Sequence, residues 1–187
     1  KYERLGLVQP GRTIGSMLDL KSLLSYVCEV IGRTVRPEAV SIYIRNPERP
    51  GYTQMAIHRS IEDNGRPQFK ETLPESSPLI RFLANVPTYL LRDDLRRTKP
   101  KTGRNEALEE LVDLGGEMAL PILHEDQLTG FLIVAPKLSG DPYFSEDIDL
   151  LSTLVSQAAI AIKNAQLYRE VALVNEYVTN IVATMES

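Results

Sequence analysis

Two uninterrupted apolar segments, joined by a short polar turn, constrain the fold of this chain more than any other sequence feature. Residues 118–123 and 130–135 carry almost no polar side chains, and residues 124–129 between them are mostly polar. Runs of this length are typical of strands that are covered on both faces. We therefore predict a hairpin at the centre of a sheet. Pro121 cannot donate a hydrogen bond to a neighbouring strand, so a bulge or a local edge is expected there.

Further strands are expected on both sides of this hairpin in the sequence. Residues 40–45 and 54–59 alternate in polarity and are separated by turn residues, which predicts a second hairpin. Weaker strand patterns occupy residues 69–73 and 88–91. Strands that pair through hairpins indicate an antiparallel sheet.

Helical patterns alternate with the strands. Apolar residues at spacings of three and four predict a first helix with Asp19 as its N-cap. Pro78 opens a short helix, and residues 105–114 form another. Ser145 is the predicted cap of a long helix that runs toward the end of the chain. Helices between the strands of an antiparallel sheet indicate one α+β domain.

The long helix changes its apolar face along its length. Its first part carries small and apolar residues that suit packing on the sheet or on a neighbouring helix. Its second part follows a heptad pattern in which β-branched residues and Asn164 occupy the a positions, a combination that favours a parallel dimer with a fixed register. Because the residues beyond Tyr168 have no evident partner in the chain, we predict a homodimer through this helix; the alternative is that the stripe packs on the first helix. The predicted dimer seam consists of Ile160, Asn164, Leu167, Val171, Val174, Val178 and Ile181.

The composition excludes several functions. The formal net charge is −4, whereas nucleic-acid binders usually carry a basic excess, so we expect no nucleic-acid partner. One cysteine cannot form an internal disulfide or a Cys-rich zinc site, and two histidines leave little room for a metal centre. No phosphate-binding Gly-rich loop, Ser-His-Asp set or pair of catalytic carboxylates is evident, so the chain is not expected to be an enzyme.

The ends of the sequence suggest a piece of a longer protein. The chain begins with Lys1 and shows no segment that resembles a signal peptide. The uncharged residues 150–162 fall short of the roughly 20 apolar residues that span a bilayer. Residues 178–187 still have a helical pattern without Gly or Pro. We expect a cytoplasmic fragment without membrane contact.

Two segments resemble the GAF domain family. Residues 119–137 resemble the central hairpin of a GAF domain, and residues 139–168 are similar to its closing turn and exit helix, in the version found in bacterial sensor histidine kinases. The sequences QAAIAI at residues 157–162 and NAQLY at residues 164–168 are the most specific part. Weaker agreement extends back to Leu18.

The resemblance implies a central antiparallel sheet of five or six strands, with helices on both faces and a long C-terminal exit helix that relays a signal. It also implies a small-molecule pocket under the short helices. In this interpretation residues 1–17 are an N-terminal linker and residues 18–168 the GAF domain. Residues 169–187 are then a coiled-coil connector to a C-terminal effector, commonly a kinase.

The candidates for this pocket are aromatic, bulky or polar residues on the strands and the short helix that flank the expected cavity. A shift of one residue in the facing of a strand would turn half of them to the other side of the sheet. The candidates are Tyr43, His58, Phe82, Tyr89, Leu91, Met118 and Phe131.

No cofactor is expected. Bilin-binding relatives hold their chromophore through a cysteine beside a histidine, whereas Cys28 stands alone in the first helix and is predicted to be buried and inert. Haem-binding relatives use a pocket histidine, for which His58 is the candidate, but most lone strand histidines are solvated or structural. His124 and Glu125 superficially resemble the phosphoacceptor box of histidine kinases. They fall in a hairpin turn, so His124 is predicted to be an exposed turn residue.

A basic loop and a partial motif bear on the charge of a ligand. Lys137 and Phe144 match part of the signature of cyclic-nucleotide GAF domains, but Pro136 replaces its Asn and its Asp-Glu pair is missing, which argues against such ligands. The loop at residues 92–104 is rich in cations and is most simply a solvated loop. If it closes over the pocket, it favours an anionic ligand through charge-assisted hydrogen bonds. The candidate anion contacts are Arg92, Arg96 and Arg97.

The leading hypothesis is a sensory module of a bacterial signalling protein, most simply a sensor histidine kinase, that binds an unknown small molecule and signals through a dimeric exit helix. One alternative is a degenerate GAF domain with a filled pocket, which acts only as a dimerisation and signal-transmitting spacer. Another is the regulatory domain of a transcription factor or of a cyclic-dinucleotide enzyme.

Overall fold

A six-stranded antiparallel sheet forms the centre of the computed structural model, which describes residues 10–61, 69–92 and 103–186. The strands lie in the order β3-β2-β1-β6-β5-β4, and every neighbouring pair is antiparallel. This confirms the predicted α+β class and strand number. The strands are β1 (Ala39–Arg45), β2 (Tyr52–Arg59), β3 (Thr72–Leu73), β4 (Leu90–Leu91), β5 (Met118–His124) and β6 (Gln127–Val134).

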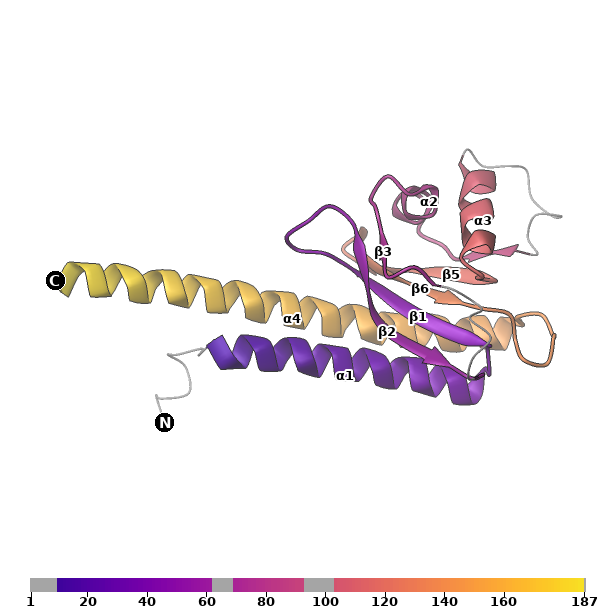
Figure 1. Cartoon of the computed structure of the whole chain (residues 1–187), viewed down its shortest axis with the longest axis horizontal. Helices are drawn as coiled ribbons and strands as arrows, with labels where there is room; N and C mark the ends of the chain where they lie inside the picture. Colours follow the sequence, from indigo (N-terminus) through magenta and orange to yellow (C-terminus); the bar gives the residue numbers. More distant parts are fainter. Residues whose placement is uncertain (1–9, 62–68, 93–102, 187) are drawn as a thin grey trace.

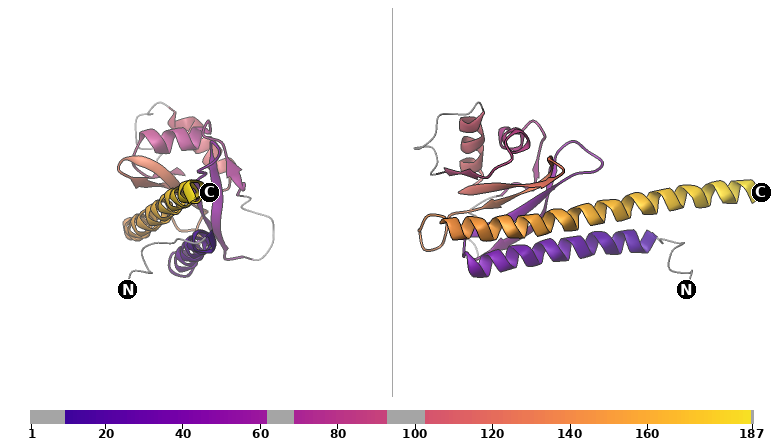
Figure 2. Two further views of the ribbon diagram at one scale, coloured as in Figure 1. Left: turned by 90° about the vertical axis from the view of Figure 1, so that its left-hand side faces the viewer. Right: turned by 180° about the vertical axis from the view of Figure 1, so that it is seen from behind.

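Helices cover both faces of the sheet. The short helices α2 and α3 lie on one face, and α1 and α4 lie side by side on the other (Figure 1). Views from other directions show that α4 continues well beyond the rest of the domain (Figure 2). The helices are α1 (Pro10–Thr34), α2 (Pro78–Asn85), α3 (Arg104–Asp113) and α4 (Ser145–Glu186). None of the described helices is long and apolar enough to cross a membrane.

The sheet separates two hydrophobic cores. Toward α1 and α4 the core is almost entirely aliphatic, with Leu24, Ile31, Ile42 and Leu151 fully buried. Toward α2 and α3 it contains several aromatic side chains. Alternate residues of the central strands enter opposite cores, which explains why β1, β5 and β6 are apolar on both faces.

The central hairpin is built as the sequence predicts, with a tighter turn. β5 and β6 are joined by Glu125 and Asp126, which both have positive φ, as in a type I′ hairpin turn. His124 ends β5 and is half-buried, so its predicted exposed position in the turn is wrong by one residue. Pro121 lies beyond Met118 and Ala119, the β5 residues that pair with β4, so the expected local edge is confirmed there among the described strands.

Two predicted helix caps are wrong. α1 begins at Pro10, so Asp19 lies inside the helix instead of capping it. α4 begins with Ser145 as its first helical residue, and the preceding Phe144 donates its backbone N–H to the Asp147 carboxylate at 2.8 Å. The cap of α4 is therefore the acidic side chain at its third position, one half of a capping box.

Candidate functional site

Three of the predicted pocket residues lie together on the α2/α3 face of the sheet. Tyr43 of β1 and Phe131 of β6 stack with ring centroids 4.8 Å apart and planes 8° from parallel. Tyr52 of β2 adds a third ring, 5.5 Å from Phe131 and tilted by 55°. Phe82 of α2 belongs to the same buried cluster. Aromatic side chains therefore fill this part of the space between the sheet and the short helices.

The other four candidates lie on the α1/α4 face. Met118 is fully buried in the aliphatic core, and Tyr89 and Leu91 pack against that core. His58 lies against α1, where a Cβ atom added at Gly32 would come within 2.2 Å of the imidazole ring. These residues do not join Tyr43 and its neighbours.

A β-bulge explains the position of His58. The pairing of β1 with β2 shifts between Ile42 and Tyr43, which leaves Met55 of β2 without a partner residue. One extra residue in a strand reverses the face toward which the following side chains point. Strict alternation from Gln54 therefore assigns His58 to the wrong face of the sheet.

A small polar group accompanies the aromatic rings. The buried Ser41 hydroxyl donates to the Ala56 carbonyl at 2.9 Å and accepts a hydrogen bond from the Gln54 amide at 2.8 Å. The Tyr43 hydroxyl donates to the carbonyl of Lys70 at 2.5 Å, and burial raises its pKa to about 12, so it remains a donor at neutral pH. Ser41 and Gln54 were not among the predicted site residues. A serine inside an otherwise apolar strand could have marked Ser41 as a candidate.

A cavity of about 320 Å³ opens between α2 and α3. This volume is at the lower end of the range for small-molecule sites, roughly 300–1,000 Å³. Phe82 is the predicted pocket residue that lines it, and Arg81 and Glu106 bring opposite charges. The lining residues are Pro78, Arg81, Phe82, Asn85, Val86, Gly103 and Glu106.

One of the three predicted anion contacts lies in the described part of the chain. The Arg92 guanidinium lies 3.7 Å from the carboxylate of Glu117, and the Arg92 backbone N–H donates to the Glu117 carbonyl at 3.0 Å. Arg92 therefore has a counter-ion of its own and joins the end of β4 to the start of β5. Arg96 and Arg97 lie outside the described residues.

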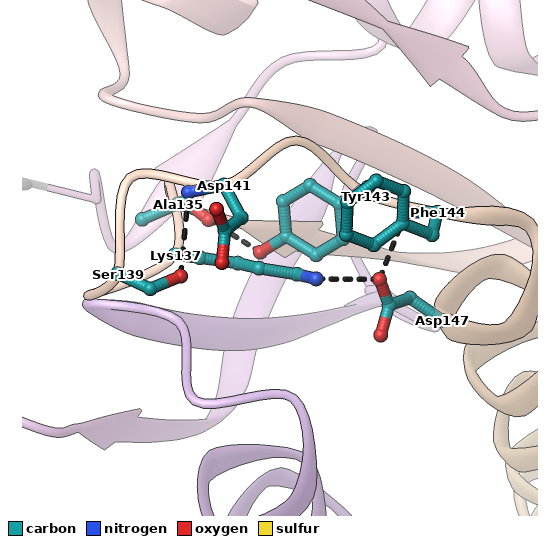
Figure 3. Close-up of polar contacts among 7 residues, drawn as sticks. All are labelled: Ala135, Lys137, Ser139, Asp141, Tyr143, Phe144 and Asp147. Atoms are coloured by element: carbon teal, nitrogen blue, oxygen red, sulfur yellow. Dashed lines mark hydrogen bonds and ion pairs between the residues drawn. The ribbon is translucent and has the colours of Figure 1, made fainter.

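The link between the sheet and α4 is held by a charged and aromatic cluster (Figure 3). The Lys137 ammonium, just after β6, contacts the Asp147 carboxylate in the first turn of α4 at 2.5 Å. The ammonium also lies 5.4 Å from the ring centroid of Tyr143 and 4.9 Å from that of Phe144. The Tyr143 hydroxyl donates to the carbonyl of Ala135 at 2.6 Å. The contacts of Lys137 and Tyr143 join the segment just after β6 to the start of the exit helix.

The ionic part of this cluster is little exposed, at 10% for the Lys137 side chain and 20% for that of Asp147. Burial by itself raises the pKa of the Asp147 carboxyl. The hydrogen bonds from Lys137 and from the Phe144 N–H, together with the lysine charge, outweigh burial and hold the pKa below its usual value. Asp147 is therefore ionised at neutral pH, and the pair fixes the direction in which α4 leaves the sheet.

The residues of the predicted seam are exposed along α4. Ile160 is 63% exposed, Val174 is 60% exposed and Val178 is 51% exposed, and Asn164 is exposed as well. The buried residues of α4 lie on its other face and end at Ala172. This exposure argues against the alternative that the stripe packs on the first helix, and dimerisation through the seam stays a prediction.

The two cofactor candidates, Cys28 and His58, both lie on the α1/α4 side of the sheet. Cys28 is fully buried in the α1/α4 core, as predicted, and burial raises its pKa to about 12. His58 lies on the α1 side of the sheet and not with the aromatic rings. Across the described residues, no group of three or more His, Cys, Asp or Glu side chains could hold a metal ion.

Solved structures with the same fold come from several kinds of protein. A GAF domain/HD domain protein from Geobacter sulfurreducens is 17% identical, with a TM-score of 0.61 over 83% of this chain and 98% of that chain. Residues 122 to 287 of a methyl-accepting chemotaxis protein are 18% identical, with a TM-score of 0.61 over 84% of this chain and 96% of that one. The phycoerythrobilin-bound GAF domain of a cyanobacterial phytochrome is 18% identical, with a TM-score of 0.56 over 85% and 92% of the two chains.

The sequence itself identifies the family. A search of curated proteins found no match to this chain. The family model of the GAF domain matches residues 17–163, which include the whole sheet, both helical layers and the first part of α4. With this match and the shared fold, the chain belongs to the GAF domain family.

Proposed function

We propose that this chain is a non-enzymatic sensory module of a bacterial signal-transduction protein, a cytoplasmic sensor histidine kinase, in which a bound small molecule alters the pose of two paired α4 helices. The observation that carries the proposal is the exposed heptad stripe of α4, which continues past the last buried residue of the domain, Ala172. Solved structures of similar fold include parts of a chemotaxis protein and of a phytochrome, which supports a role in signalling.

Dimerisation through the seam follows from the chemistry of the stripe. Exposed apolar residues in a sustained heptad are buried when two such helices pair, and the β-branched residues at the a positions favour a parallel pair. Asn164 at one a position would face its copy across the pair and fix the register at a cost in stability.

The relay would run through the start of α4. The Lys137–Asp147 pair couples the central strand β6 to the helix, so a displacement of the sheet changes the direction of α4. A pair of such helices is a two-state element whose equilibrium a ligand can bias.

Light scattering across a range of protein concentrations tests the dimer. We expect a dimer. Asn164→Val should tighten it, because an apolar side chain would replace a polar one at a position that the dimer buries. Thr179→Val, at an exposed position of α4 off the seam, is the matched control and should leave the dissociation constant unchanged. A monomer at high concentration for both the native chain and the Asn164→Val variant would refute the seam.

A second candidate function is a spacer that binds nothing and only transmits strain. The packed rings of Tyr43, Tyr52 and Phe131 favour it, because they occupy the interior where the pocket was expected. Native mass spectrometry of freshly purified protein separates the two functions. A retained small molecule supports the sensor, and a ligand-free spectrum together with an intact dimer supports the spacer.

The kind of effector is a separate question. The sequence of the parent protein after Ser187 would distinguish a kinase from other effectors.

A further inference from the structure

A second cavity, of about 290 Å³, lies on the α1/α4 side of the sheet, where α4 leaves the domain. The end of β1 and the β1–β2 turn form one wall, and α1 and α4 form the other. Most of the surface is aliphatic, from Leu20, Ile44, Ile162, Ala165 and Leu173. The cavity is separated by the sheet from the aromatic rings and from the hollow between α2 and α3.

Two arginines line the same cavity, and each is paired with an exposed carboxylate. Arg45 contacts Glu75 at 3.0 Å, and Arg169 contacts Glu48 of the β1–β2 turn at 2.9 Å. Glu48 is 74% exposed, whereas Arg169 is 30% exposed. Exposed ion pairs of this kind contribute little net stability, so another anion can replace the glutamate at small cost.

We propose that this cavity binds an amphipathic monocarboxylate, with its hydrocarbon tail against the aliphatic wall and its carboxylate on Arg169. The aliphatic surface requires an apolar body, and the Arg169 guanidinium favours a negative head. Glu170 also lines the cavity and repels a second negative charge, so a singly charged carboxylate is favoured over a phosphate ester.

Binding has a structural consequence at the exit helix. The Arg169–Glu48 pair ties the β1–β2 turn to α4, 121 residues away in the sequence. A carboxylate that replaces Glu48 on Arg169 breaks the ion pair between the β1–β2 turn and α4 and so removes one restraint on α4. This consequence rests on the proposed signalling role of α4, whereas the binding itself does not.

Isothermal titration calorimetry of the whole chain with hexanoate, octanoate and decanoate tests the inference. Each methylene that enters the cavity should tighten binding about fourfold. Arg169→Gln should weaken decanoate binding about tenfold, because a charged hydrogen bond is lost. Glu48→Gln should tighten it by up to about fivefold, because the competing carboxylate is gone.

Matched controls distinguish the site from nonspecific binding. Arg33→Gln removes an exposed arginine of α1 that does not line the cavity, and it should leave the affinity unchanged. Gln166→Phe should fill the cavity and abolish binding without a change of charge, with circular dichroism as the check of folding. Decyltrimethylammonium, which has a similar tail and the opposite charge, should bind at least tenfold more weakly than decanoate.

The inference is overturned if decanoate does not bind, if the cationic detergent binds equally well, or if Arg169→Gln and Arg33→Gln have the same effect. Light scattering of the same samples reports the dimer separately. A dimeric chain that binds no carboxylate refutes this site and leaves the proposed function standing, and a monomer that binds decanoate does the reverse.

Discussion

The two halves of α4 are similarly rich in apolar residues but bury them in different ways. In the first half, Leu151 and Ile162 are fully buried against the sheet and α1. In the second half, Val171 is 52% exposed and Val174 is 60% exposed. The first half is also attached to the sheet by the Lys137–Asp147 pair.

The difference shows that apolar content alone does not determine what a helix packs against. In the first half, the small residues Ala158 and Ala165 face α1 and the sheet and let them approach closely. In the second half, larger β-branched residues repeat with the heptad period, which matches a second helix and not a flat sheet. One helix thus carries an intramolecular surface followed by one that requires another chain.

The most severe test of this contrast introduces charged residues into the second half of α4. Val174→Glu combined with Val178→Glu places two glutamates in the predicted seam of each helix, where like charges would meet across the dimer. We expect the dissociation constant to rise by more than about 100-fold, because unpaired charges in an interface are costly. Sedimentation equilibrium measures this change.

The control for this variant adds the same charge off the seam. Thr179 and Asn180 are exposed positions on the other side of the helix, and Thr179→Glu with Asn180→Glu should leave the dimer intact. If both double variants dissociate the dimer equally, net charge and not the seam is responsible.

Truncation of one buried and one exposed residue makes the same comparison within the folded domain. Leu151→Ala should reduce the free energy of unfolding by about 2–5 kcal/mol, because it opens a cavity in the α1/α4 core. Val178→Ala should change the stability of the monomer by less than about 0.5 kcal/mol. Urea unfolding at several protein concentrations measures both.

The dependence on concentration separates the two roles. The loss for Leu151→Ala should be the same at every concentration, whereas any effect of Val178→Ala should grow where the dimer is populated. A large, concentration-independent loss for Val178→Ala would mean that the second half also packs within its own domain.

Most of the fold could be predicted from the sequence because its strongest patterns are local. The apolar runs around the turn at Glu125 and Asp126 specify the central hairpin, and the spacing of residues after Ser145 specifies the exit helix. Helix boundaries were less accurate. Asp19 is a residue type that favours caps, but α1 continues through it to Pro10, which shows that the preference for a cap did not set the start of this helix.

The candidate site was harder to predict because it depends on which face each strand residue points toward. The bulge at Met55 reverses the facing of β2, and nothing in the local alternation marks it. Met118 was assigned to the pocket by its bulk, but it pairs with Val134 and shares its face. Tyr43 and Phe131 lie on the α2/α3 face, where the pocket was expected, but their stacked rings fill that space, and their role as pocket residues stays a prediction.

The attachment of the first half predicts a pH dependence that the second half lacks. Because the pKa of Asp147 is lower in the folded protein than in the unfolded chain, its stabilising effect is fully present above the unfolded value of about 3.9. It is lost as the pH falls through the folded pKa, where the carboxyl takes up a proton in both states. Asp147→Asn should therefore cost about 1–2 kcal/mol at pH 7, and this cost should shrink as the pH falls through the folded pKa.

Urea unfolding of the native chain and of Asp147→Asn at a series of pH values from 7 downward measures the difference, and the other carboxyl groups contribute equally to both proteins. Asp149→Asn, an exposed carboxylate of the same helix, is the control and should show no such convergence. A gap between the native chain and Asp147→Asn that stays constant with pH would mean that the carboxylate charge does not hold α4. The attachment of the first half would then rest on the packing of residues such as Leu151 and on the aromatic contacts of Lys137, and protonation of Asp147 could not loosen it.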